Sequence, residues 1–221
     1  MRYIATMKSP LILLLAAVLF APVASATIDK APLEKWLKSQ QEHHSAYAEF
    51  VQTRKLVTLR KPLVHRGKMW AKRPNLFLWQ MGDPAVVTVL RKNDSYLYLD
   101  KEKNEAVMMG ADSKYARQFE LLTGDMGENM DEFEKRFIIK DTKVVNGVYH
   151  ATFTPTNRRF RKRVPWLILS VDARTSRTAG FEIHLDDKSV ISTRFTRYSL
   201  DVAIPDSRFK VDTTGYKIKR K

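Results

Sequence analysis

Side chains suited to acid–base or metal chemistry are few in this sequence, and their spacing matches no catalytic or metal-binding motif. The chain has five histidines, and two of them, His43 and His44, are adjacent. Adjacent side chains on a helix point in different directions, so this pair does not favour a metal site. The chain has no Gly-rich phosphate loop, no G-x-S-x-G and no H-E-x-x-H. These observations predict no enzyme, no metal and no cofactor.

The absence of cysteine excludes several further kinds of chemistry. Without a thiol there is no disulfide, no thiolate zinc site, no iron–sulfur cluster and no cysteine nucleophile. Lipidation of a cysteine is excluded for the same reason.

Residues 67–81 indicate a binding site rather than a catalytic site. This segment predicts a hairpin in which one strand ends at an Arg73-Pro74 corner and a strand rich in large apolar residues follows. Pro74 favours an extended conformation for Arg73, which holds the arginine at the strand end. Its guanidinium can donate several hydrogen bonds to whatever lies over the sheet. On the returning strand Phe77 and Trp79 share one face. The alternative is a core hairpin with a solvated arginine at its tip.

A strongly basic run lies between two expected strands, where it predicts a hairpin loop. Its cations are Arg158, Arg159, Arg161, Lys162 and Arg163. The run is either a solvated loop or a patch for anionic headgroups or an acidic partner, worth ~1 kcal/mol per cation near an anionic membrane. Tail residues Lys217, Lys219, Arg220 and Lys221 can add to such a patch. The whole chain carries a formal net charge of +15.

The N-terminus has the anatomy of a secretory signal peptide over residues 1–26. Arg2 and Lys8 precede an apolar run over 11–23, and a small-x-small cleavage pattern follows. The run is shorter than the ~20 residues of a membrane span, although an uncleaved anchor is the alternative. Cleavage removes both cations and lowers the net charge from +15 to +13. A periplasmic protein is expected, and it does not meet nucleic acid.

An amphipathic helix is expected near the mature N-terminus, over about residues 29–44. Asp29 can serve as its N-cap, and Pro32 is tolerated in a first turn. Leu33, Trp36, Leu37 and Gln40 fall on one stripe of this helix, at a spacing of three and four residues.

The rest of the chain is expected to be mainly β, with about ten or eleven strands joined by short turns. The expected strands are 47–59, 65–72, 75–81, 85–91, 96–100, 137–145, 148–154, 166–171, 180–185, 190–199 and a short one at 207–211. A helical insert, begun by Asp112 or Ser113 and ended by Gly124, interrupts them, and a short helix follows at 129–136. This pattern favours an antiparallel barrel or sandwich made of hairpins.

The segment around Arg73 resembles the outer-membrane lipoprotein carrier protein (LolA) family. Its members carry a Lys-Arg-Pro-x-x-Phe-x-Trp pattern, and here Lys72-Arg73-Pro74 is followed by Phe77 and Trp79. The order of elements is similar as well, from an amphipathic helix and an F-V-Q strand start to a helical insert and a basic tail.

The resemblance implies a LolA/LolB-like fold: an incomplete antiparallel β-barrel that wraps helices, with an α lid over an apolar concave side. It implies one domain over residues 27–221, present as a monomer. Periplasmic members take an acylated lipoprotein from an inner-membrane ABC-type transporter, shield its acyl chains and pass it to an outer-membrane acceptor lipoprotein. This chain has no cysteine, so it cannot be the lipid-anchored acceptor and fits the carrier.

The resemblance also points to site residues. The matching arginine of the family hydrogen-bonds the lid helices and favours the closed, empty state, so Arg73 is the expected lid latch. The side chains available to contact acyl chains are Trp36, Phe50, Trp70, Phe77, Trp79, Tyr115, Phe119 and Leu122.

Three alternatives stay open. The first concerns the cargo: because the basic run departs from the simplest family pattern, the cargo can be a glycolipid or another acylated product instead of a lipoprotein. A lipid-sensing regulatory domain of related fold is the second alternative. An exported lipid-modifying hydrolase is the third.

Overall fold

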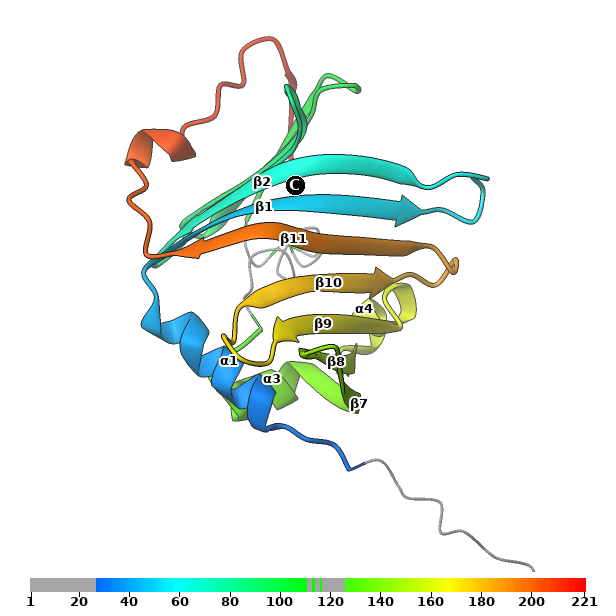
Figure 1. Ribbon diagram of the computed structural model, residues 1–221. Coiled ribbons are helices and arrows are strands. Elements are labelled where there is room, and N and C mark those ends of the chain that lie inside the picture. Colours follow the sequence, from blue (N-terminus) through cyan, green and yellow to red (C-terminus); the bar gives the residue numbers. More distant parts are fainter. Residues whose placement is uncertain (1–26, 111–112, 114–115, 117–125) are drawn as a thin grey trace, which may run out of the picture.

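The computed structural model describes residues 27–110, 113, 116 and 126–221 (Figure 1). The expected signal peptide, residues 1–26, lies outside the described residues. Tyr115, Phe119 and Leu122 of the expected lid helix lie outside them as well.

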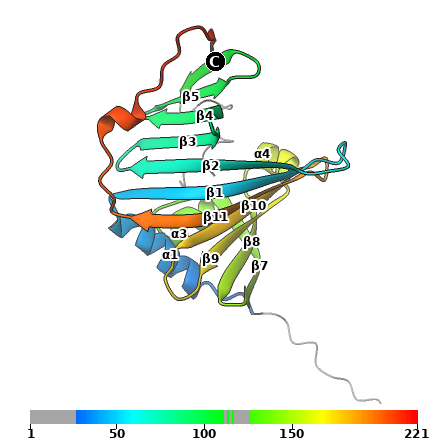
Figure 2. The ribbon, with the colours of Figure 1, turned by 45° about the horizontal axis from the view of Figure 1, so that its top comes forward.

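One curved sheet of twelve strands dominates the fold. Its strands are β1 (Ser45–Lys55), β2 (Leu63–Lys72), β3 (Leu76–Gly82), β4 (Ala85–Lys92), β5 (Ser95–Asp100), β6 (Glu105–Gly110), β7 (Phe137–Val145), β8 (Val148–Pro155), β9 (Trp166–Asp172), β10 (Thr178–His184), β11 (Val190–Leu200) and β12 (Lys217–Arg220). Their order is β12-β6-β5-β4-β3-β2-β1-β11-β10-β9-β8-β7, and the pairing is antiparallel except between β12 and β6. The edge strands β12 and β7 are not paired with each other in the described part of the chain, so the sheet is an open half-barrel (Figure 2). The mainly-β, incompletely closed fold predicted from the sequence is confirmed.

The described residues also contain three helices, α1 (Ala31–Glu42), α3 (Met130–Arg136) and α4 (Arg158–Arg163), and the 3-10 turn η1 (Asp206–Phe209). Among them, no helix is long and apolar enough to cross a membrane.

Helix α1 forms close to where the sequence predicts it, and its apolar stripe faces the sheet. Leu33, Trp36 and Leu37 are buried. The N-cap position belongs to Lys30 rather than to the expected Asp29, whose Oδ1 accepts a hydrogen bond from the Ala31 N–H at 3.1 Å. The helix therefore begins slightly later than expected, with the carboxylate still satisfying one of its free N–H groups.

The basic run was wrongly expected to be a hairpin loop, because it forms helix α4. The side chain of Asn157 caps this helix by accepting a hydrogen bond from the Phe160 N–H at 3.0 Å. Arginine and lysine favour helices, so a capped run of them is stable as a short helix between two strands.

The end of the chain also differs from expectation. Residues 207–211 were expected to form a strand, but η1 covers most of them and buries Phe209. Strands β6 and β12 were not expected. The sequence of β6 is poor in β-branched residues, so its strand conformation depends on pairing with β5 and β12.

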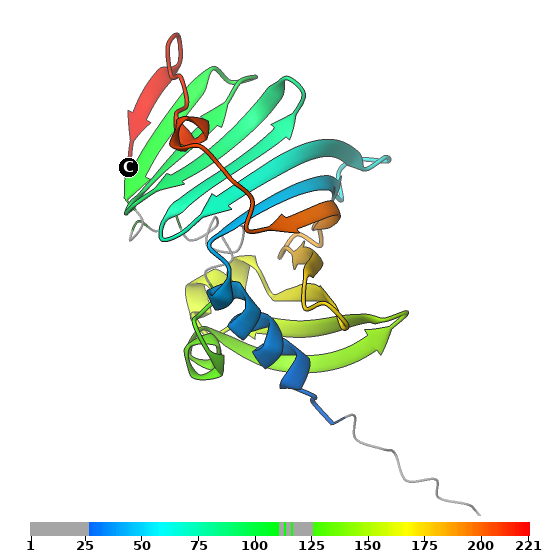
Figure 3. The same cartoon turned by 60° about the vertical axis from the view of Figure 1, so that its left-hand side comes forward.

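Two apolar clusters lie on opposite faces of the sheet. The inner-face cluster joins α1 and α3 to residues of most strands, including Phe50, Phe77 and Trp79. The outer-face cluster consists of Leu78, Leu90, Ile204 and Phe209, with Trp70 and others packed against it. The segment after β11 crosses the outer face from β11 to β12 and covers this second cluster (Figure 3).

Candidate apolar binding cavity

A cavity of about 370 Å³ lies between α1 and the inner face of the sheet. Its apolar lining includes Trp36, Leu37, Met69, Phe77, Leu169, Phe181, Phe195 and Leu200. The polar lining residues Gln41, His44 and Arg73 mark its mouth. The mouth therefore lies at the end of the sheet where β1 begins and β2 ends. The volume falls within the range of about 300–1,000 Å³ that is typical of small-ligand sites.

The structure brings together four of the aromatic residues singled out from the sequence. Trp36 and Phe77 line the cavity itself. Phe50 and Trp79 are buried behind it, with their rings stacked at a centroid distance of 3.8 Å. This stack has room only because Gly67 lies opposite Phe50, where a Cβ atom would overlap the phenyl ring. Phe50 and Trp79 thus form a rigid floor, and Trp36 and Phe77 form part of the wall.

Trp70 does not join this group. It lies on the outer face, where its ring is 5.6 Å from that of Tyr47 and the Arg208 guanidinium lies 4.9 Å from its centroid. Adjacent strand residues face opposite sides of a sheet, and Met69 occupies the inner side at this point. The remaining candidates, Tyr115, Phe119 and Leu122, lie outside the described residues.

The C-terminal end of α1 is held to the rim of the sheet by Arg73. The Arg73 Nη2 group donates hydrogen bonds to the backbone oxygen of Gln40 and to Oε1 of Gln41, each at 2.8 Å. The Arg73 backbone N–H donates to the carbonyl oxygen of His44 at 2.9 Å. A residue of the β2–β3 corner therefore contacts the last turn of the helix and the chain that leaves it.

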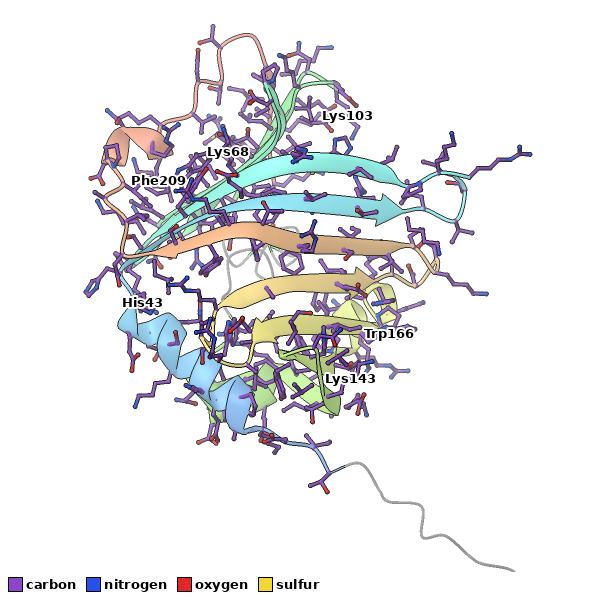
Figure 4. The ribbon with its side chains drawn as sticks, viewed as in Figure 1. His43, Lys68, Lys103, Lys143, Trp166 and Phe209 are labelled. Carbon is purple, nitrogen blue, oxygen red and sulfur yellow. The ribbon has the colours of Figure 1, made fainter. Side chains whose placement is uncertain are left out.

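Asp201 holds the same end of α1 from the other side. One carboxylate oxygen lies 2.6 Å from Nδ1 of His43, and the other accepts the His44 N–H at 2.9 Å. The hydrogen bond from the His43 side chain, followed by the one from the His44 backbone, lowers the pKa of the Asp201 carboxyl below its ordinary value. Figure 4 shows His43 at this end of the helix. The adjacent histidines thus have a structural role in closing α1.

The N-terminal end and the middle of α1 are anchored to the other half of the sheet. The Tyr149 hydroxyl donates to the backbone oxygen of Asp29 at 2.7 Å, and burial raises the pKa of this hydroxyl to about 12. Lys30 forms an ion pair with Glu134 of α3 at 2.6 Å. Trp36 Nε1 donates to Oγ1 of Thr178 at 3.0 Å. Helix α1 therefore roofs the cavity and is fastened at both ends.

Several lining residues were not singled out from the sequence. Met69, Leu169, Phe181, Phe195 and Leu200 come from four different strands. The alternation of apolar residues within each strand marks the face that is buried, but it does not tell which buried residues border a cavity rather than pack in the core.

The basic helix α4 lies away from the cavity mouth. It follows β8, and its cations Arg158, Arg159, Lys162 and Arg163 are exposed, while Arg161 donates to the Pro155 carbonyl oxygen at 3.1 Å. The basic tail belongs to β12 at the opposite edge of the sheet, so the structure does not bring tail and run together in one patch. Within the described residues, no cluster of acidic or histidine side chains is arranged to hold a metal ion.

An open, mainly antiparallel sheet whose inner face carries a cavity beneath a helix defines a binding protein of the half-barrel class. The chain belongs to the family of the outer membrane lipoprotein carrier protein LolA, whose model matches residues 41–212. The resemblance stated from the Lys-Arg-Pro segment is thereby confirmed.

Comparison with solved structures found similar chains. An uncharacterized conserved protein from Thermus thermophilus has a TM-score of 0.53 at 7% identity, covering 87% of this chain and 100% of its own. A LolA superfamily protein from Nitrosomonas europaea has a TM-score of 0.43 at 11% identity, covering 84% of this chain and 99% of its own. The MucA/MucB complex of Pseudomonas aeruginosa contains a chain with a TM-score of 0.44 at 12% identity, covering 82% of this chain and 59% of its own. No curated protein matches the chain in sequence.

Proposed function

We propose that this protein is a periplasmic carrier that holds the acyl chains of a lipoprotein in the cavity and ferries it from the inner to the outer membrane. The observation that carries the proposal is a cavity of about 370 Å³ that is roofed by helix α1 and has both apolar and polar lining residues, with Trp36, Phe77 and Phe181 among the apolar ones. Exposing an acyl chain to water costs about 0.8 kcal/mol per CH₂, so a carrier must bury its cargo against apolar surface. Membership of the LolA family supports the same function.

Movement of α1 is the proposed route for cargo to enter. The contacts at the ends of the helix are mainly exposed hydrogen bonds and an ion pair, of the kind that contribute about 0–1 kcal/mol each. The strands beneath the helix are held by their own ladder of hydrogen bonds. Lifting the helix also uncovers the buried side chains of Leu33, Trp36 and Leu37, so in the proposed opening the acyl chains of the cargo replace these apolar contacts while the sheet stays folded.

Arg73 is the proposed latch of this roof. It belongs to the sheet, yet its side chain hydrogen-bonds the last turn of α1 through Gln40 and Gln41. Both bonds are lost when the helix moves away. They therefore stabilise the closed, empty state, and cargo must compete with them.

The proposed setting follows from the sequence. Residues 1–26 support export as a cleaved signal peptide, leaving a monomeric single domain over 27–221. The proposed partners are an ABC-type transporter of the inner membrane and an acceptor lipoprotein of the outer membrane. A glycolipid is the alternative cargo, favoured by the cations Lys72, Arg73 and Arg91 in the cavity lining.

Filling the cavity tests the proposal. Ala46 lies on β1 and lines the cavity, so Ala46→Phe places a phenyl ring where acyl chains would lie. We expect at least a tenfold loss of affinity for a fluorescent fatty acid, which corresponds to about 1.4 kcal/mol. Ala173→Phe, at an exposed turn, is the matched control and should bind as the wild type does. Equal affinity of both variants would contradict binding in this cavity.

A further inference from the structure

The β1–β2 hairpin carries an unusual apolar tip. It projects past the neighbouring strands at the end of the sheet opposite the cavity mouth (Figures 1 and 2). Its large apolar side chains are exposed to solvent: Val57 by 64%, Leu59 by 44%, Leu63 by 40% and Val64 by 59%. Single exposed apolar residues are common on proteins, but a cluster on one projecting loop marks an interaction surface.

Cations surround this apolar tip. Residues 54–66 contain five Lys or Arg residues and no Asp or Glu. Four of these cations are exposed, namely Lys55, Arg60, Lys61 and Arg66, whereas Arg54 is half-buried with its Nε atom out of contact with solvent. Apolar side chains flanked by cations fit the boundary between the headgroups and acyl chains of an anionic bilayer, where apolar burial and electrostatic attraction add to each other.

The same end of the molecule also includes helix α4. The Val57 N–H donates to Oγ of Ser189 in the β10–β11 loop at 3.4 Å. In that loop the Asp186 N–H donates to the carbonyl oxygen of Arg163, the last residue of α4, at 3.1 Å. These two hydrogen bonds connect the β1–β2 hairpin to the β10–β11 loop and that loop to α4. The loop itself contains two acidic residues, Asp186 and Asp187. The positive charge of this end is therefore not confined to the hairpin.

We propose that this end of the molecule docks on an anionic phospholipid bilayer. Val57, Leu59, Leu63 and Val64 enter the headgroup region, and the exposed cations of the hairpin and of α4 contact lipid phosphates. This inference goes beyond the proposed function, and its test needs no cargo.

The docked orientation follows from the topology. Strand β1 runs from Ser45, at the cavity mouth, to Lys55, at the hairpin. At about 3.3 Å per residue the two ends lie roughly 33 Å apart. Docking through the hairpin therefore turns the mouth away from the bilayer, where a partner protein can reach it.

Vesicle binding tests the docking surface. The full mature chain is mixed with vesicles of phosphatidylcholine, with or without phosphatidylglycerol, and binding is measured by co-flotation. We expect binding only to vesicles with phosphatidylglycerol, weakening as salt rises. Val57→Ser with Val64→Ser is expected to lower this binding at least tenfold, and Arg60→Gln with Lys61→Gln by a similar factor.

A matched control is available on the β7–β8 hairpin. Val144 and Val145 are exposed by 59% and 46% and lie at the other end of β8 from α4. Val144→Ser with Val145→Ser should bind vesicles as the wild type does. The proposal would be overturned if the Val57/Val64 and Val144/Val145 double variants bound vesicles equally well. It would also be overturned if the protein bound neutral and anionic vesicles equally, or if it captured an acidic protein but bound no vesicles.

A single attached fluorophore tests the orientation, because the chain has no cysteine of its own. A probe at Thr58→Cys, on the hairpin tip, should shift to the blue when vesicles are added. A probe at Glu42→Cys, beside the mouth, should keep its emission in water. A blue shift at Glu42→Cys without one at Thr58→Cys would overturn the proposal, and thermal unfolding checks that each variant is folded.

Discussion

Replacing Arg73 by leucine removes both hydrogen bonds that its side chain makes to α1. Nη2 donates to Gln40 O and to Gln41 Oε1, each at 2.8 Å. A hydrogen bond with a charged partner contributes about 1.5–3 kcal/mol. Solvent competes at these exposed atoms, so we take about 1 kcal/mol for each bond. The two bonds then favour the closed state by about 2 kcal/mol, a factor of about 30 in the ratio of closed to open molecules.

If acyl chains enter only the open state, the fraction of open molecules sets the apparent affinity for them. The apparent affinity then rises in proportion to the open fraction. Arg73→Leu is expected to bind a fluorescent fatty acid up to about 30-fold more tightly, and to release it to an acceptor more slowly. Gln41→Ala removes one acceptor and keeps the backbone oxygen of Gln40, so its effect should be about 5-fold. Amide hydrogen exchange in α1 measures the opening directly.

Lys72→Leu is the control for the loss of a cation beside the mouth. Lys72 pairs with Asp206 at 2.6 Å, on the segment that crosses the outer face rather than on α1. Its replacement should leave exchange in α1 at the wild-type rate. If Arg73→Leu also leaves both the exchange of α1 and the affinity for the probe unchanged, the two hydrogen bonds do not control the roof.

Three further predictions concern the floor, the closure and the wall of the cavity. Gly67→Ala should lower the free energy of unfolding by about 1–3 kcal/mol, measured by urea denaturation, because its methyl group would overlap the ring opposite it. Asp201 has a lowered pKa in the folded protein, so its stabilising contribution is present above its ordinary pKa of 3.8 and is lost as the pH falls through the lower folded value. Asp201→Asn should remove this part of the acid sensitivity, measured by thermal unfolding below pH 3.8, since it removes the titrating partner of His43. A brominated fatty acid should quench Trp36, which lines the cavity, so Trp36→Phe should lower the quenching and Trp166→Phe should leave it unchanged.

The sequence predicts the sheet well where strands alternate and turns are short. The segment from residue 75 to 100 is an example, since Gly82 and the Asn93-Asp94 pair separate strands that pair with their sequence neighbours. Prediction was poor where a segment depends on distant partners. Strand β12 exists because Lys217 to Arg220 pair with β6, more than a hundred positions away. No local pattern encodes that contact.

The candidate site shows the same division. The proline corner predicted that Arg73 lies at a strand end, but its proposed role as a latch depends on the resemblance to the LolA family. Trp36 was singled out as a large apolar residue of the first helix. Trp70 was wrongly grouped with them, since a strand rich in apolar residues on both faces does not reveal which face meets the cavity. The outer cluster around Phe209 resolves the ambiguity, because it supplies an apolar cover for the second face.

Native mass spectrometry of the protein, purified gently from its own cells, tests the proposed carrier function most directly. We expect a fraction of molecules with the added mass of an acylated protein, and loss of that fraction in Ala46→Phe but not in Ala173→Phe. A bound glycolipid would contradict the lipoprotein cargo. A protein that carries no lipid or acylated ligand under any gentle extraction would contradict the carrier function itself.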